Sequence, residues 1–111
     1  MQPLFGIATP AQGWYKPAKP WRSPAYRRFV RAHRCALCGS WRGVECAHSG
    51  PHGISEKADD RTGVPLCRRC HRTGPASYHK LGRRFFLTHG LDVERITGEL
   101  QREFARERRA A

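Results

Sequence analysis

Two pairs of cysteines with the same spacing constrain this chain more than any other feature. Two residues separate Cys35 from Cys38, two separate Cys67 from Cys70, and 28 residues lie between the pairs. Two such pairs are typical of a tetrahedral zinc–thiolate site. We therefore expect one structural Zn²⁺ that ties the turn before a first short strand to the start of the helix after a second. Four unrelated buried cysteines are the weaker alternative, because both pairs share one spacing.

The length of the chain makes such a metal site useful. At 111 residues there is room for one small domain and for no second independent core. Residues 1–8 lack the basic start and long apolar stretch of a secretory signal, and no apolar run approaches membrane length. We therefore expect a cytoplasmic protein with reduced, metal-binding cysteines and no membrane partner. Cys46 has no partner pair and is expected to face the core as a small apolar residue.

The remaining segments predict short helices and strands around the zinc site, which makes the expected fold class α+β. Ser23-Pro24 is typical of a helix start, and Asp92 of another. Gly90 is expected to end the helix before it. A stripe of Val93, Ile96, Leu100 and Phe104 predicts that the last helix packs on the domain. We expect helices over about 24–33, from about Cys67 to Gly74, from Ser77 to about Thr88 and from Asp92 onward, with strands over 44–48 and 64–66.

The charge of the chain is clustered and strongly positive. Lysine and arginine number 21 against 9 acidic residues, for a formal net charge of +12. Residues 1–34 carry seven basic residues and no acid, and residues 61–89 carry seven more and again no acid. Charge kept for solubility would not need to be clustered in this way. The pattern favours a polyanionic partner, namely a nucleic acid, over a small-molecule substrate.

The first 22 residues form a basic, proline-rich arm, and residues 23–111 form the domain. The segment WYKPAKPWR, residues 14–22, mixes tryptophans with Lys16, Lys19 and Arg22. Such an arm can stack on bases and neutralise phosphates. A tail that packs on the domain through Trp14 and Trp21 is an equally good interpretation.

Two longer motifs carry a family resemblance. The segments CALCGSWRGVECAHSGPHG (35–53) and KADDRTGVPLCRRCHRTGPASYHKLG (57–82) resemble the HNH nucleases, in particular a small phage- and prophage-associated branch with AH-[ST]-GPHG and CHRTGPxSYHxLG motifs. The resemblance spans about residues 24–95. It implies a ββα-metal fold, in which two antiparallel strands and a helix surround a catalytic metal, in a bacterial or phage-infected cell.

The resemblance also implies a role for three histidines. His48 matches the general base at the end of the first strand, and a histidine with a near-neutral pKa suits that task. His71 matches a ligand of the catalytic ion at the start of the helix, and His79 a second ligand. That ion would be Mg²⁺, Mn²⁺ or a transition metal. A zinc-site neighbour without catalytic function is the plainer interpretation of His71.

Two positions depart from the family's pattern. The residue before the base is often a metal-binding aspartate or histidine, and here it is Ala47. The middle asparagine of the motif falls at about Thr62, and the chain contains no asparagine. Asp60, Asp59 and His52 are candidates to complete the ligand set.

Basic residues near the site are candidates for nucleic-acid contacts. One of Arg68, Arg69 and Arg72 could clamp the scissile phosphate, and Lys57 could contact another phosphate. A basic surface turn and a solvated lysine are the plainer alternatives. The sequence thus predicts an HNH endonuclease that cleaves DNA with His48 as base and leaves 5′-phosphate and 3′-hydroxyl ends. The alternative is a non-catalytic zinc-containing module that binds DNA or RNA.

The clustered charge predicts DNA binding that depends steeply on salt. The logarithm of the affinity should fall by about 0.9 per phosphate contact for each log unit of salt. Fluorescence anisotropy on a labelled duplex at several salt concentrations measures this slope. Deleting residues 1–22 should flatten the slope if the arm touches DNA, whereas an unchanged slope would assign the arm to packing.

Overall fold

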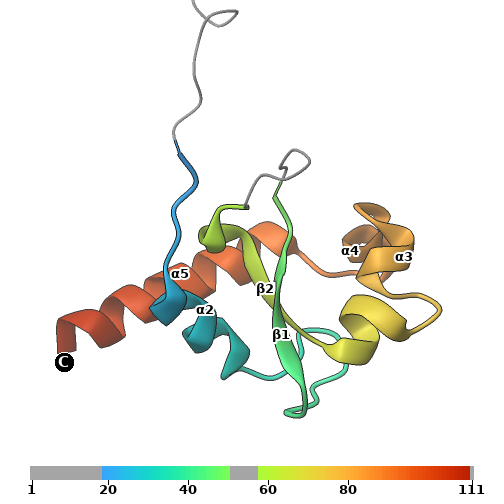
Figure 1. The fold of residues 1–111 in the computed structure, drawn as a ribbon, viewed down its shortest axis with the longest axis horizontal. Coiled ribbons are helices and arrows are strands. Elements are labelled where there is room, and N and C mark those ends of the chain that lie inside the picture. The colour runs from blue at the N-terminus through green and yellow to red at the C-terminus, as the bar shows by residue number, and fades with distance from the viewer. Residues whose placement is uncertain (1–18, 51–57, 111) are drawn as a thin grey trace, which may run out of the picture.

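The computed structural model describes residues 19–50 and 58–110, in which helices surround a small two-stranded sheet (Figure 1). The expected α+β class is therefore confirmed at the level of mixed helices and strands. Residues 1–18, 51–57 and 111, which include most of the predicted basic arm, lie outside the described residues. In chain order the elements are α2 (Pro24–Arg31), β1 (Val44–His48), η2 (Asp60–Thr62), β2 (Gly63–Cys67), η3 (Arg69–Thr73), α3 (Tyr78–Leu81), α4 (Arg84–Thr88) and α5 (Val93–Ala110).

Helix α2 begins as the sequence predicts. The hydroxyl of Ser23 accepts a hydrogen bond from the backbone N–H of Tyr26 at 3.0 Å, and Pro24 occupies the first turn, where a missing N–H costs little. The helix ends at Arg31, two residues earlier than expected. Tyr26 and Val30 are buried, so this face of α2 packs into the domain.

Strands β1 and β2 pair antiparallel, with Val44 opposite Cys67 and His48 opposite Gly63. The first strand has the predicted bounds, and the second extends one residue beyond the prediction at each end. Pro65 is accommodated because both strands of a two-stranded sheet are edges. Its carbonyl accepts a hydrogen bond from the N–H of Ala36, which fastens the first cysteine turn to β2.

The segment after β2 differs from the prediction in one respect. The turn η3 has π-helical geometry, which often marks functional sites. The single helix expected from Ser77 to Thr88 is instead two short helices, α3 and α4. Gly82, at a φ of 63°, separates them, and this left-handed backbone favours glycine and breaks the helical path.

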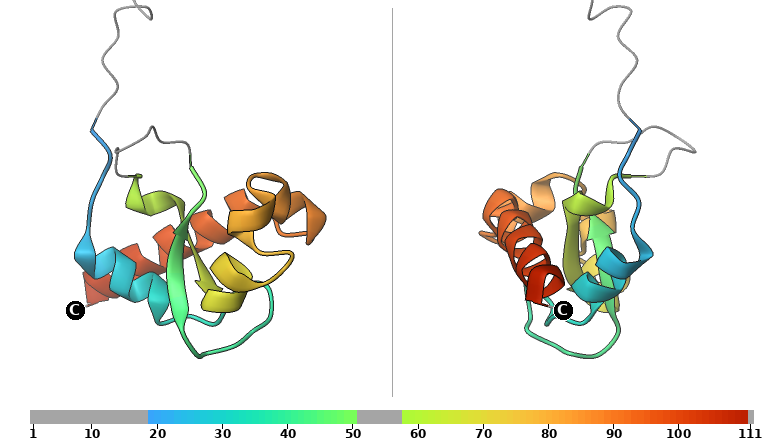
Figure 2. Two further views of the ribbon diagram at one scale, coloured as in Figure 1. Left: turned by 45° about the vertical axis from the view of Figure 1, so that its right-hand side comes forward. Right: turned by 90° about the vertical axis from the view of Figure 1, so that its left-hand side faces the viewer.

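Helix α5 runs along much of the molecule, from the region of α3 and α4 to α2 (Figures 1 and 2). Its first turn is capped as predicted, since Asp92 accepts a hydrogen bond from the N–H of Arg95 at 3.0 Å. Leu100 of the predicted stripe is buried, and Ile96 and Phe104 are partly buried against the core. The periodicity therefore identified the packed face correctly.

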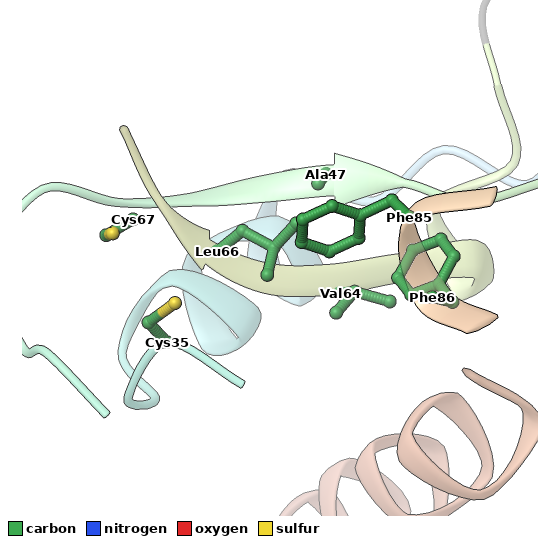
Figure 3. Packing of buried hydrophobic residues seen from close by; sticks show 7 residues of the cluster. All are labelled: Cys35, Ala47, Val64, Leu66, Cys67, Phe85 and Phe86. Carbon is green, nitrogen blue, oxygen red and sulfur yellow. The ribbon is translucent and has the colours of Figure 1, made fainter. Parts of the chain in front are cut away.

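Two apolar clusters lie on opposite faces of β1. The first, formed by Cys35, Ala47, Val64, Leu66, Cys67, Phe85 and Phe86, joins the sheet to α4 (Figure 3). The second joins α2 to α5 through Tyr26, Val30 and Leu100, with Cys46 packed against it. Neighbouring residues of a strand point to opposite faces, so Ala47 and Cys46 belong to different clusters. Cys46 thus faces the core, as expected.

Within residues 19–50 and 58–110, every helix is too short or too polar to cross a lipid bilayer.

The first cluster should dominate stability. Phe85 is fully buried between the sheet and α4, whereas Leu87 on the same helix is 86% exposed. Phe85→Ala should lower the free energy of unfolding by about 3–5 kcal/mol, because it removes buried surface and leaves a cavity. Leu87→Ala is the matched control and should change that free energy by less than about 0.5 kcal/mol. Urea unfolding followed by circular dichroism measures both, and equal effects would contradict the described packing.

Candidate functional site

Four cysteines lie together as the sequence predicts. The sulfur atoms of Cys35, Cys38, Cys67 and Cys70 all lie within 4.8 Å of one another, and Cys38 Sγ is 3.7 Å from Cys67 Sγ. A zinc–thiolate tetrahedron with Zn–S bonds of about 2.3 Å has sulfur–sulfur edges of about 3.8 Å. The four side chains therefore fit a structural metal such as zinc. Cys46 stands apart from this group.

The backbone around the first cysteines favours a thiolate. The N–H of Cys38 points to Cys35 Sγ at 3.5 Å, and the N–H of Cys70 points to Cys67 Sγ at the same distance. Burial acts to raise the pKa of Cys35, but N–H donors from Cys38, Cys67 and Leu37 outweigh it and lower this pKa to about 7. Deprotonation of Cys35, which metal binding requires, is thus made easier before any metal arrives, whereas burial and the neighbouring sulfur atoms raise the pKa of Cys70.

His71 lies directly after the last cysteine and is held by a carboxylate. Its Nδ1 is 2.7 Å from Glu45 Oε1, which also accepts a hydrogen bond from Arg72 Nε at 2.9 Å. The imidazole is 6% exposed. Burial lowers the pKa of His71, aided by the neighbouring His79 and opposed by Glu45. A neutral ring whose Nδ1 is engaged by Glu45 has Nε2 left as a metal-binding nitrogen.

His79 comes beside His71 because the chain folds back after Gly74. The ring centroids of His71 and His79 lie 4.6 Å apart at an interplanar angle of 80°. The hydroxyl of Tyr78 donates a hydrogen bond to the carbonyl of His48 at 2.9 Å, which attaches the start of α3 to the end of β1. His79 is exposed, so this histidine pair has one buried and one solvent-exposed imidazole.

His48, at the end of β1, has a different carboxylate partner. Its Nε2 is 2.9 Å from Asp60 Oδ1. The Asp60 side chain is fully buried and also binds Arg22, Arg27 and the backbone N–H of Ser23. Burial acts to raise the pKa of Asp60, but these hydrogen bonds and charges together hold it below its ordinary value.

The structure brings some predicted site residues together and separates others. Among the described residues, the four cysteines are the one group of three or more potential ligands whose donor atoms cluster. Asp60, a candidate ligand in the sequence, is instead bonded to His48 and to the start of α2. Asp59 is bound by Arg61 and by the N–H of Trp21. His52 lies outside the described residues.

The residues predicted to contact nucleic acid also differ in how the structure places them. Arg68 and Arg69 are exposed next to the cysteine cluster, and Lys19 is exposed before α2. Arg72 is half exposed but paired with Glu45, and Arg22 is paired with Asp60. Lys16 and Lys57 lie outside the described residues.

Sequence reasoning missed the residues that hold the histidines. Glu45, Tyr78 and Arg27 were not singled out, although each touches a predicted site residue or its partner. A signal for Glu45 was present, since it is the acidic residue of a short, mostly apolar strand and shares a face with Ala47. Tyr78 and Arg27 join segments far apart in the chain, and no local pattern indicates such contacts.

Comparison with known proteins gives a match to a family model. A family model described as "Protein of unknown function (DUF968)" matches residues 8–106, which is most of the chain. No curated protein and no solved structure matches.

The cysteine cluster predicts one tightly bound zinc per chain after dialysis, measured by elemental analysis. Cys70→Ser should lose the metal and lower the melting temperature, because a structural zinc contributes directly to folding. Cys46→Ala is the matched control, since Cys46 lies outside the cluster, and it should retain the zinc. A Cys70→Ser protein that keeps its zinc and melts like the parent would rule out the four-cysteine site.

Proposed function

We propose that this chain, which belongs to the DUF968 family, is a metal-dependent HNH endonuclease that hydrolyses phosphodiester bonds in DNA. The observation that carries the proposal is the pairing of His71 with His79 beside the cysteine cluster, with His48 at the end of β1. The order β1, β2 and η3 fits the strand, strand and helix of a ββα-metal motif. On this proposal η3 stands for the start of the motif's helix.

His71 and His79 would hold the catalytic cation. Glu45 engages Nδ1 of His71, which leaves Nε2 for the cation in the carboxylate–histidine–metal arrangement common in metalloenzymes. Two imidazoles leave positions for water and phosphate oxygens, as divalent ions in nucleases require. When bound, such a cation stabilises negative charge on the scissile phosphate and on the departing 3′ oxygen.

His48 would act as the general base. Its side chain is partly exposed at the end of β1, so its ring can reach solvent and substrate while one nitrogen is held by Asp60. A base in this position takes a proton from a water molecule placed in line with the scissile bond. Tyr78 would set the relative positions of base and cation, because its hydroxyl binds the His48 carbonyl and its neighbour is His79.

The surface beside this site suits a polyanion. Arg68 and Arg69 are exposed on the turn that carries Cys67 and Cys70, next to His71. The nearest acid, Glu45, is occupied by His71 and Arg72. Phosphates would therefore meet cations at this edge of the domain, with little repulsion.

One observation favours the alternative of a non-catalytic zinc-containing module that binds DNA or RNA. Within the described part of the chain, only the cysteines form a group of three or more clustered ligands. A nucleic-acid-binding module needs the zinc site and the exposed arginines, but it needs neither the Glu45–His71 pair nor the base. Cleavage with added divalent ions separates the two functions.

The proposal predicts cleavage that depends on the histidines in different ways. His48→Ala should reduce plasmid cleavage by about 10²–10⁴-fold and leave zinc content and DNA affinity unchanged, because a general base acts only in the transition state. His71→Ala should also reduce cleavage, with activity partly regained at high Mg²⁺ or Mn²⁺. The measurement is plasmid nicking across a divalent-ion titration.

His33→Ala is the control for these variants, since His33 binds the Phe29 carbonyl and Glu103, both outside the proposed site. It should cleave like the parent. If the parent binds DNA but no divalent ion supports cleavage, the alternative module is correct. If His71→Ala loses the structural zinc, His71 belongs to the cysteine site.

A further inference from the structure

The Asp60 carboxylate is surrounded by polar groups from two parts of the chain, the end of β1 and the start of α2. Its Oδ1 lies 2.9 Å from His48 Nε2 and 3.0 Å from Arg22 Nη1. Its Oδ2 accepts from the N–H of Ser23 and from Arg27 Nη1, both at 2.6 Å. The Asp60 side chain is fully buried, so the protein itself satisfies this carboxylate.

These contacts determine which nitrogen of His48 carries hydrogen. Two guanidinium groups and a backbone N–H always donate, so they require Asp60 to be an ionised acceptor. An ionised carboxylate has no hydrogen to give. The hydrogen in the contact between His48 and Asp60 must therefore belong to Nε2, and in the neutral ring Nδ1 is then the unprotonated nitrogen.

We propose that Asp60 is the positioning residue of His48: it fixes the imidazole in the Nε2–H tautomer and directs Nδ1 to act as the base. This inference rests on the proposed endonuclease function for its chemical step. In that step Nδ1 takes a proton from water, and the water oxygen forms a bond to phosphorus. The bond from phosphorus to the 3′ oxygen breaks, and solvent supplies a proton to that oxygen.

The same contacts fix the orientation of the ring. Asp60 is the first residue of η2, and its partners Ser23 and Arg27 belong to the start of α2, some 37 and 33 residues earlier. The backbone N–H of Asp60 also donates to the Trp21 carbonyl. Because both the side chain and the backbone of Asp60 are held, the His48 ring that it binds would lose little conformational freedom when substrate binds. Asp60, a candidate metal ligand in the sequence, would therefore position His48 instead.

The tautomer is measured directly by long-range ¹H–¹⁵N correlation spectra of the zinc-loaded, ¹⁵N-histidine-labelled protein at about pH 8. The signals of His48 are assigned by their loss in His48→Gln. We expect Nε2 to carry the hydrogen and Nδ1 to be unprotonated. A ring protonated on Nδ1 alone, or on both nitrogens, would overturn the proposal, and this readout does not depend on cleavage.

A matched pair of variants tests whether Asp60 is what fixes the tautomer of His48. Asp60→Asn, whose amide can donate as well as accept, should mix the two tautomers and reduce the cleavage rate by about 10²-fold at unchanged DNA affinity. Asp59→Asn is the control, because Asp59 binds Trp21 and Arg61 rather than a histidine. It should leave the His48 tautomer unchanged. An Asp60→Asn protein that folds and keeps the parental tautomer and rate would contradict the positioning role.

The outcomes separate this proposal from the proposed function. A parent with the expected tautomer but no cleavage in any divalent ion would overturn the endonuclease and leave the fixed tautomer established. A parent that cleaves through His48 with hydrogen on Nδ1 would retain the endonuclease and overturn the role of Asp60.

Discussion

An isolated two-stranded sheet is marginally stable in water, and here four clustered cysteines that could hold a metal lie at one end of the sheet. Cys67 ends β2 opposite Val44, the first residue of β1. Cys35 and Cys38 lie on the turn that the Pro65 carbonyl fastens to β2. A metal at this cluster would therefore fix the register of the sheet, and it would also hold η3, with His71 beside Glu45, against β1.

The alternation of β1 distributes the functional candidates over two sides of the sheet. Glu45 and Ala47 face the side of η3 and α4, whereas Cys46 and His48 face the side of α2. Two of the three predicted histidines thereby meet their own carboxylates, His71 at Glu45 and His48 at Asp60. The proposed base and the proposed cation ligands therefore lie on different faces of the sheet, and Tyr78, the neighbour of His79, binds the His48 carbonyl through its hydroxyl.

Local patterns in the sequence predicted the parts of the fold that depend on neighbouring residues. Ser23 and Asp92 cap their helices, and β1 has its expected bounds, because caps and strand alternation are set within a few positions. The break at Gly82 was missed because a single glycine is tolerated within a helix, so the sequence alone does not indicate the left-handed backbone that Gly82 adopts. The cysteine spacing identified the cluster that could hold a metal, whereas Asp60 binds Ser23 and Arg27 across more than thirty residues, and such contacts have no local signature.

The distribution of charge follows from these internal contacts. Glu45, Asp59 and Asp60 each bind an arginine, so the acids nearest the histidines are used to orient other side chains. Buried or paired carboxylates project little negative charge into solvent, because their partners neutralise them at short range. The exposed arginines of the η3 turn thus determine the potential that an approaching phosphate meets. The acids that position the proposed catalytic groups therefore oppose the binding of a polyanion less than their number suggests.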